Sequence, residues 1–187
     1  MQQNNSRASS GSASANGRRG FTLVELSIAI TILMIAMVSI AASTSRMHSL
    51  RKQNHERTIG HNGLRSMAER IHAASYGFSD EPGSWATNLL GRYSPGGAFG
   101  DEFDVLGLSP VAGEPSVGRI TILTDETLTD AALGTRMGMP RDLNGDSAAD
   151  DADVSLNARI LPVVLTIRWR SRDEVNELRH GFYVLGY

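Results

Sequence analysis

One apolar run dominates the hydrophobic pattern of this 187-residue chain. Between Phe21 and Ala42 the only charged residue is Glu25, and neither proline nor glycine interrupts the run. An α-helix rises about 1.5 Å per residue, so a helix of this length spans about 30 Å, the thickness of a bilayer's hydrocarbon core. We therefore expect residues 21–43 to form a membrane-spanning helix.

The helical pattern continues beyond the apolar run, because residues 44–76 contain no proline. Residues 51–58 are polar on all sides and predict a solvated stretch. Gly60 and Gly63 weaken a helix, so they indicate a bend or a point of close packing against another helix. Farther along, apolar residues recur at three- and four-residue spacing and predict one face that packs on a sheet; they are Leu64, Met67, Ala68, Ile71 and Ala74.

The remainder, residues 77–187, has the pattern of a small β domain. Residues 77–118 are rich in glycine and proline and predict loops with one short strand at 103–108. Longer strands are predicted at 119–125, 158–170 and 180–187, joined by a polar connection between the last two. Pro162 restricts the start of the second strand to an edge or a bulge. The expected fold class is α+β, a long N-terminal helix on an antiparallel sheet of three or four strands.

Two details of this β domain concern how its side chains are placed, and the second has two interpretations. From Val163 onward, alternate residues of the 158–170 strand are apolar on one face and mixed on the other. The aromatic residues of the loop region form either an exposed contact patch or local packing under the loop; they are Trp85, Tyr93 and Phe99.

The segment before the apolar run differs from it completely. Residues 1–20 are rich in Ser, Asn, Gly and Ala, carry three arginines and no acid, and cannot form a core. A carboxylate in an apolar helix costs a few kcal/mol unless it is paired, so Glu25 needs a cation. A cut between Gly20 and Phe21 would create an α-amino group four residues from Glu25.

This combination resembles the type IV prepilin family, which includes the type II secretion pseudopilins. The resemblance rests on a basic leader, Gly20, Phe21, Glu25 and the apolar span. It implies that a prepilin peptidase cuts after Gly20 and methylates Phe21. It also implies that Glu25 pairs with the terminal amine of a neighbouring subunit during assembly, and that the expected sheet domain is pilin-like.

Two other export signals are alternatives to this interpretation. A secretory signal peptide would use Arg18 and Arg19 as its basic region and would be cut near residues 41–43, and a twin-arginine signal would use the same pair. The apolar run is longer than the usual 7 to 15 residues of a signal peptide and it contains Glu25. Both features favour the prepilin interpretation.

Residues 142–153, DLNGDSAADDAD, are the one stretch with metal-binding chemistry. Oxygen ligands fall at loop positions 1, 3, 5, 9 and 12, with a backbone carbonyl at position 7, which is the spacing of an EF-hand calcium loop. The glycine expected at position 6 is replaced by Ser147, and a solvated acidic turn is the alternative. The predicted structural Ca²⁺ ligands are Asp142, Asn144, Asp146, Ala148, Asp150 and Asp153.

Composition narrows the function further. The formal net charge is −2 and becomes −5 without the leader, which gives no basic stripe for nucleic acid. There is no cysteine, so no disulfide is possible, and no catalytic motif is present. His48, His55, His61 and His72 form no i, i+4 pair and are expected in solvated positions. An enzyme is not expected.

The sequence thus predicts a minor pilin or pseudopilin with a leader (1–20), an assembly helix (21–43), a second helix half (44–76) and a β domain (77–187). It would be anchored once in the inner membrane with a periplasmic C-terminal domain, or be incorporated in a surface fibre. Its partners would be prepilin peptidase, other pilin subunits and the membrane. The alternative is a calcium-dependent binding module with an ordinary signal sequence.

Overall fold

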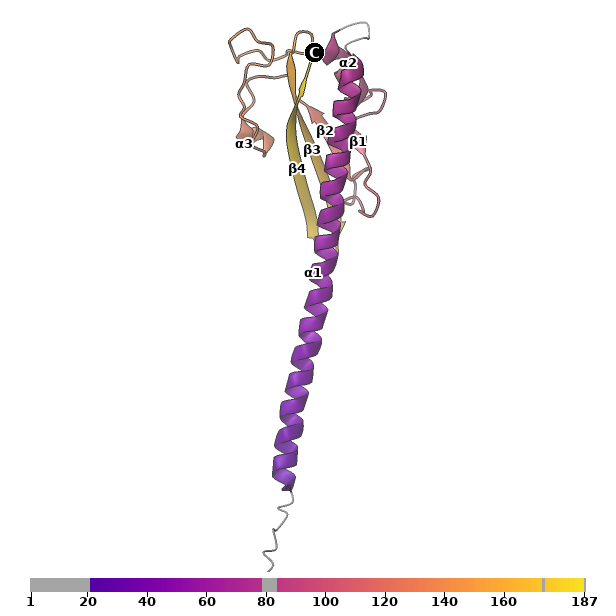
Figure 1. Cartoon of the computed structure of the whole chain (residues 1–187), viewed down its shortest axis with the longest axis vertical. Helices are drawn as coiled ribbons and strands as arrows, with labels where there is room; N and C mark the ends of the chain where they lie inside the picture. The colour runs from indigo at the N-terminus through magenta and orange to yellow at the C-terminus, as the bar shows by residue number, and fades with distance from the viewer. Residues whose placement is uncertain (1–20, 79–83, 173, 187) are drawn as a thin grey trace, which may run out of the picture. The chain divides into compact units, whose positions relative to one another are not determined.

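The computed structural model describes residues 21–78, 84–172 and 174–186. The leader 1–20, including Gly20, lies outside these residues. The chain divides into two compact units, Met1–His48 and Ser49–Tyr187. The elements in chain order are α1 (Leu23–Gly77), α2 (Trp85–Tyr93), β1 (Glu102–Phe103), β2 (Gly118–Ile122), α3 (Asp130–Leu133), β3 (Ile160–Ser171) and β4 (Glu174–Leu185) (Figure 1).

Helix α1 extends over 55 residues and confirms the prediction of a long N-terminal helix. Nothing in its sequence stops it before Gly77, since the first proline after the leader is Pro82. In the first unit every residue from Phe21 to His48 is exposed. In the second unit one face of α1 is buried against the sheet, as its three- and four-residue apolar spacing predicts.

The sheet has four antiparallel strands in the order β1-β2-β3-β4. The fold is therefore α+β and pilin-like, as expected. The strand predicted at 103–108 is shorter, because only Glu102 and Phe103 pair with β2. The predicted polar connection before the last strand was wrong. Residues 174–179 are strand, and β3 and β4 are joined by two residues, of which Arg172 has φ 55°.

Pro162 lies within β3, at a point where β2 has already ended. The last β2 pairing joins Ile122 to Val163, and Leu123 N then donates to the Pro162 carbonyl at 2.9 Å. The missing proline N–H therefore interrupts no pairing between β2 and β3, which agrees with the edge position that the sequence predicts.

The main core lies between α1 and the sheet. The alternate β3 residues Val163, Leu165, Ile167 and Trp169 share one face, as predicted, and the structure buries all four there. Five residues of the predicted apolar face of the helix contribute to the same core. Four are buried, namely Leu64, Met67, Ala68 and Ile71, and Ala74 is partly buried.

Gly60 and Gly63 let this sheet approach the helix. A Cβ on Gly60 would lie 3.0 Å from Leu178 Cδ1, and one on Gly63 would lie 2.7 Å from Val105 Cγ2. The glycines therefore serve close packing, but against strand and loop residues, whereas the sequence predicts another helix. Their neighbours belong to the sheet side of the domain, and α1 continues through both positions without a break.

A second, smaller core covers the opposite face of the sheet at its upper end in Figure 1. Its residues come from the segment between β2 and β3 and from β3 itself. Asp130 connects α3 to residues 137–139 of this segment. Its carboxylate accepts the backbone N–H groups of Met137, Gly138 and Met139 at 2.9–3.0 Å. The pKa of Asp130 is lowered by these three bonds, of which that from Met139 has the largest effect.

The sequence prediction missed helix α2, because its region is punctuated by glycine and proline. Ser84 caps it by accepting the N–H of Thr87 at 3.1 Å. Leu89 and Tyr93 are buried in the main core, and Trp85 packs beside them. Phe99 is 62 % exposed, with its ring centroid 5.9 Å from that of Tyr93. Of the two predicted alternatives, local packing therefore applies to Trp85 and Tyr93, whereas Phe99 lies on the surface.

Candidate processing and assembly site

Glu25 is held by a reciprocal capping box at the start of α1. Its Oε2 accepts the backbone N–H of Thr22 at 3.0 Å, while the Glu25 N–H is donated to Thr22 Oγ1 at 3.2 Å. The Thr22 hydroxyl is also 3.1 Å from Oε2. Two otherwise unpaired helix N–H groups are thereby satisfied, with Thr22 as N-cap and Glu25 at the third helical position.

Sequence reasoning missed Thr22. The pattern threonine, two residues, glutamate before an apolar run is the signal that could have found it. The structure thus brings together Phe21, Thr22 and Glu25 at one helix end. Phe21 is 89 % exposed, so no described part of the chain covers the predicted mature terminus.

The apolar part of α1 has no cover either. An 18-residue window of the helix has a mean hydropathy of 2.4, and none of it is buried. Large aliphatic side chains such as Leu23, Ile32 and Val38 are 62–83 % exposed. Transfer of this much apolar surface out of water is strongly favourable, so in the cell the segment requires lipid or other helices around it.

Comparison with known families identifies this segment. Residues 15–41 match the model of the prokaryotic N-terminal methylation motif. Comparison with curated proteins finds no match, and neither does comparison with solved structures. The motif indicates a type IV pilin-like or pseudopilin-like subunit that prepilin peptidase processes, a membrane-anchored structural protein and no enzyme. The individual roles of Gly20, Phe21 and Glu25 stay predictions.

The acidic loop 142–153 is irregular and folds around its own carboxylates. Asp142 accepts the N–H groups of Gly145 at 2.5 Å and Ser147 at 2.8 Å. These two bonds, the first more strongly, lower the pKa of Asp142. The Ser155 N–H has the same effect on the pKa of Asp153. Asn144 and Asp146 each accept a loop N–H in the same way.

The backbone of this loop fits a calcium loop better than its side chains do. Ser147, at the position where EF-hand loops require glycine, has φ 79°, the left-handed conformation that the sharp turn needs. Within the described ranges, however, no three His, Cys, Asp or Glu side chains are placed to hold a metal ion. The six predicted ligands, from Asp142 to Asp153, form no preassembled centre, and calcium binding by them stays a prediction.

A buried carboxylate next to this loop was also missed from the sequence. Glu126 is completely buried, and its Oε1 accepts the N–H groups of Leu143 at 2.6 Å and Asn144 at 3.2 Å. Its Oε2 has no hydrogen-bond partner among the described residues. Nothing in the local sequence, TDETLT, marks Glu126 as buried, because its partners are 17 and 18 residues away.

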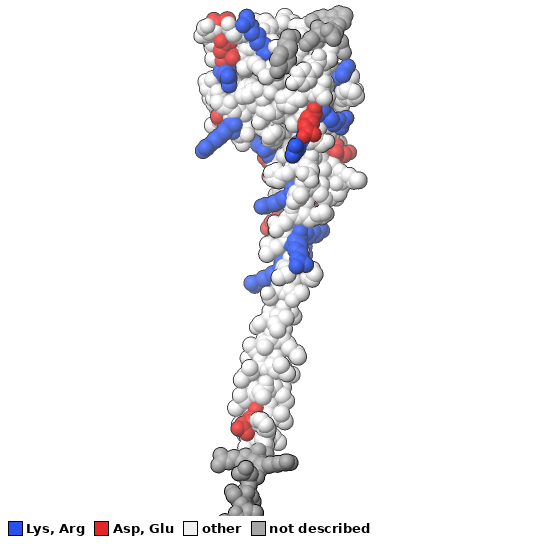
Figure 2. Space-filling view, viewed as in Figure 1, with Lys and Arg blue, Asp and Glu red and all other residues white. Residues whose placement is uncertain are grey.

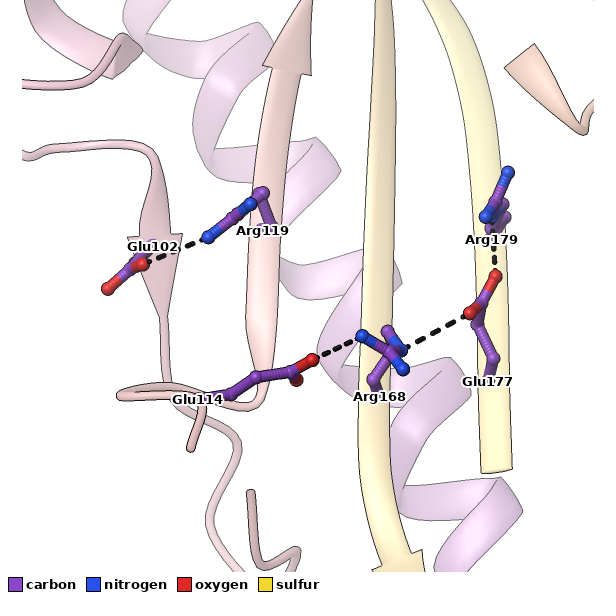
Figure 3. A network of polar contacts seen from close by, with 6 residues as sticks. All are labelled: Glu102, Glu114, Arg119, Arg168, Glu177 and Arg179. Carbon is purple, nitrogen blue, oxygen red and sulfur yellow. Dashed lines mark hydrogen bonds and ion pairs between the residues drawn. The ribbon is translucent and has the colours of Figure 1, made fainter. Parts of the chain in front are cut away.

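A charged network crosses the outer sheet face, opposite α1 (Figure 3). Glu114 pairs with Arg168, Arg168 with Glu177 at 3.4 Å, and Glu177 with Arg179 at 2.6 Å. Arg119 pairs with Glu102 at 3.3 Å beside them. The side chains are 30–63 % exposed, so each pair contributes at most about 1 kcal/mol. The network joins neighbouring strands, and its charges are matched within it.

The predicted helix histidines are placed as expected in part. His48, His55 and His61 are exposed. His72 is partly buried, and its ring centroid lies 4.9 Å from that of Phe182. One residue of the polar stretch 51–58 differs from the prediction that this stretch is solvated. Glu56 is 9 % exposed and its Oε2 accepts the Trp169 indole N–H at 3.3 Å, so this stretch is not solvated on every side.

Proposed function

We propose that this chain is a minor pilin or pseudopilin, a structural subunit of a type IV pilus, a competence fibre or a type II secretion pseudopilus. The observation that carries the proposal is an exposed apolar helix whose first part, from Leu23, lies within residues 15–41, the match to the N-terminal methylation motif. Such a helix needs lipid before assembly and neighbouring helices afterwards. The precursor would be cut after Gly20, and Phe21 would become the methylated terminus.

In this proposal the subunit crosses the inner membrane once, and its β domain lies in the periplasm before it enters a fibre. The outer face of the sheet and the loops would then face away from the fibre axis. Helix packing would supply most of the contact area, and Glu25 would set recruitment and register by pairing with the terminal amine of a neighbour.

The capping box suggests a sharp test of this pairing. Glu25 has two separable roles, a local one as acceptor for the Thr22 N–H and a proposed one as a negative charge. Glu25→Gln keeps an oxygen acceptor at the third helical position but removes the charge, because glutamine also serves in capping boxes. Thr22→Val removes the cap hydroxyl and keeps the charge.

We expect Glu25→Gln and Glu25→Ala both to insert in the membrane and both to be lost from purified fibres, while Thr22→Val is incorporated. The measurement is the amount of each variant in sheared fibres relative to the membrane fraction, in cells that lack the wild-type copy. Normal incorporation of Glu25→Gln would overturn the charge-pairing role and leave capping as the function of Glu25.

The alternative function is a calcium-dependent binding module released or anchored by an ordinary signal sequence. The two are distinguished by the intact mass and first residue of the protein from its own membranes. A chain that begins at Phe21 with one added methyl group supports the pilin proposal. A chain that begins near Ser43 would overturn it.

A further inference from the structure

Cations surround α1 at the level where the β3–β4 hairpin meets the helix. Two contacts join these segments: Arg172 Nη1 donates to Ser49 Oγ at 2.6 Å, and Glu56 accepts from Trp169 at 3.3 Å. Figure 2 shows blue side chains on the helix just below the sheet. We call the five exposed cations of this region the basic collar; they are Arg51, Lys52, Arg57, Arg170 and Arg172.

The helical members of the basic collar point in three different directions. At 100° per residue, Lys52 lies 100° around the helix from Arg51, and Arg57 lies about 140° beyond Lys52. The three also lie within about 9 Å along the helix axis. A protein partner on one side of the helix would meet only part of this set. A surface that crosses the helix axis would meet all of it.

The positive charge of the basic collar is mostly uncompensated. Within the described part of the chain, neither Arg51 nor Arg57 has an ion-pair partner. Glu56 is buried and lies 3.7 Å from Lys52, and Glu174 is exposed next to the hairpin. Residues 44–58 contain four Arg or Lys and a single acid, Glu56.

The basic collar also lies close in the chain to the apolar span. Arg51 follows Ser43 by eight positions, which is about 12 Å as α-helix and at most about 29 Å in any conformation. The headgroup layer is roughly 5–8 Å thick on each side of the hydrocarbon core, and the surface potential decays over about 8–10 Å at physiological salt. In the proposed orientation this is the translocated flank, where cations are normally few.

We propose that the basic collar binds the anionic headgroups of phospholipids on the membrane face next to the β domain. Phosphodiester oxygens accept hydrogen bonds from guanidinium and ammonium groups, and a headgroup layer presents them on every side of a helix that crosses it. The proposal rests on the membrane-spanning part of the proposed function and does not require fibre assembly. It assigns the collar to lipid rather than to a neighbouring subunit.

The test uses the full-length chain in nanodiscs that contain equal amounts of phosphatidylglycerol and phosphatidylcholine. The protein is released into native mass spectrometry, and the lipids that remain bound are counted by mass. We expect wild type to retain phosphatidylglycerol at least threefold over phosphatidylcholine. In a variant with all five collar residues changed to Gln, we expect the ratio to fall to about one.

A matched control removes the same number of cations elsewhere in the second unit, Ser49–Tyr187. It carries Arg→Gln at five exposed positions, which are Arg65, Arg70, Arg119, Arg136 and Arg141. We expect this control to keep the wild-type lipid ratio. Trp169 lies beside the collar, so an unchanged fluorescence spectrum establishes that each variant is folded.

Three results would overturn the proposal. One is equal retention of the two lipids by wild type, and another is loss of the preference in the control as well. The third is a collar variant that keeps the wild-type ratio but is missing from fibres, which would assign the cations to a protein partner. Because lipid retention needs only an inserted chain, a failure of fibre assembly in the Glu25 variants is a separate result.

Discussion

At the scale of single residues, glycine decides how closely α1 and the sheet approach. A side chain at Gly63 would enter the space of Val105, with both methyl carbons within 2.9 Å of the added Cβ. Gly91, in helix α2, has nothing within 4 Å of such an atom. The same substitution therefore has opposite physical consequences at the two positions.

We expect Gly63→Ala to lower the free energy of unfolding by about 1–3 kcal/mol, because it overpacks the helix–sheet contact. Gly91→Ala is the control, and we expect it to be neutral or to stabilise by up to about 1 kcal/mol, because alanine favours the helix. Urea unfolding of the full chain in detergent measures both. Equal effects of the two substitutions would contradict the close-packing role of Gly63.

The bond between Glu56 and Trp169 is the second residue-scale determinant. Trp169 is 1 % exposed, and removal of Glu56 takes away the acceptor of its indole N–H. We expect Glu56→Ala to cost about 1–3 kcal/mol, the penalty of an unpaired buried donor plus the lost packing. Glu56→Gln keeps an acceptor and should cost clearly less. Thermal unfolding followed by tryptophan fluorescence compares them, and equal losses would exclude the hydrogen bond as the cause.

At the scale of elements, the segment between β2 and β3 is held by charge-assisted hydrogen bonds rather than by regular structure. Asp130 ties residues 137–139 to α3, and Tyr183 on β4 donates to the Met137 carbonyl at 2.6 Å. Bonds to an ionised carboxylate are stronger than neutral ones, so this segment should depend on pH.

The pKa of Asp130 is lowered in the folded protein, chiefly by the Met139 N–H. Its ionised form therefore stabilises the fold above the unfolded value of about 3.9, and this contribution disappears as the pH falls through the folded pKa. We expect Asp130→Asn to lower the unfolding temperature at pH 7, and we expect this difference to shrink as the pH falls below about 4. Unfolding temperatures of both chains across this range measure it. A difference that is constant with pH would contradict the charge effect.

The acidic loop leads to a prediction at the same scale. If residues 142–153 bind calcium, millimolar Ca²⁺ should raise the unfolding temperature of the full chain, because a ligand of the folded state stabilises it. A chelator should reverse the rise, and Asp142→Ala with Asp146→Ala should remove the response. Magnesium at the same concentration is the control for ionic strength. An unchanged unfolding temperature in wild type would make the loop a solvated acidic turn.

At the scale of the whole molecule, the two units have different sources of stability. Both cores are built entirely from residues of the second unit, Ser49–Tyr187. The exposed residues 21–48 contribute no core contact. Stability of the β domain should therefore not depend on the apolar helix.

We expect a chain that begins at Thr44 to be a soluble, monomeric domain with a cooperative unfolding transition. Its midpoint should match that of the full chain in detergent within a few degrees, because every buried contact is retained. Circular dichroism measures the transition. A chain that aggregates or melts without cooperativity would mean that the apolar helix contributes to the folding of the domain.

Local sequence was enough to predict part of this structure. The helical spacing of Leu64 to Ala74 and the alternation from Val163 to Trp169 indicate buried faces, because each period follows from the geometry of one element alone. The same holds for the apolar span and the cleavage motif around Gly20, Phe21 and Glu25, which need no partner in the fold to be recognised. The capping pattern of Thr22 with Glu25 is equally local, although the prediction from sequence missed it.

Tertiary structure decided what depends on residues that are distant in the chain. The burial of Glu56 depends on Trp169, 113 residues away, and that of Glu126 on a loop 17 residues later. The same applies to the strand at 174–179, whose polar residues pair with β3, and to helix α2, whose burial outweighs its glycine-rich surroundings. The basic collar also depends on tertiary structure, because it brings cations of α1 together with cations of the β3–β4 hairpin. Local pattern reports the period of one element, whereas these features arise from contacts between elements.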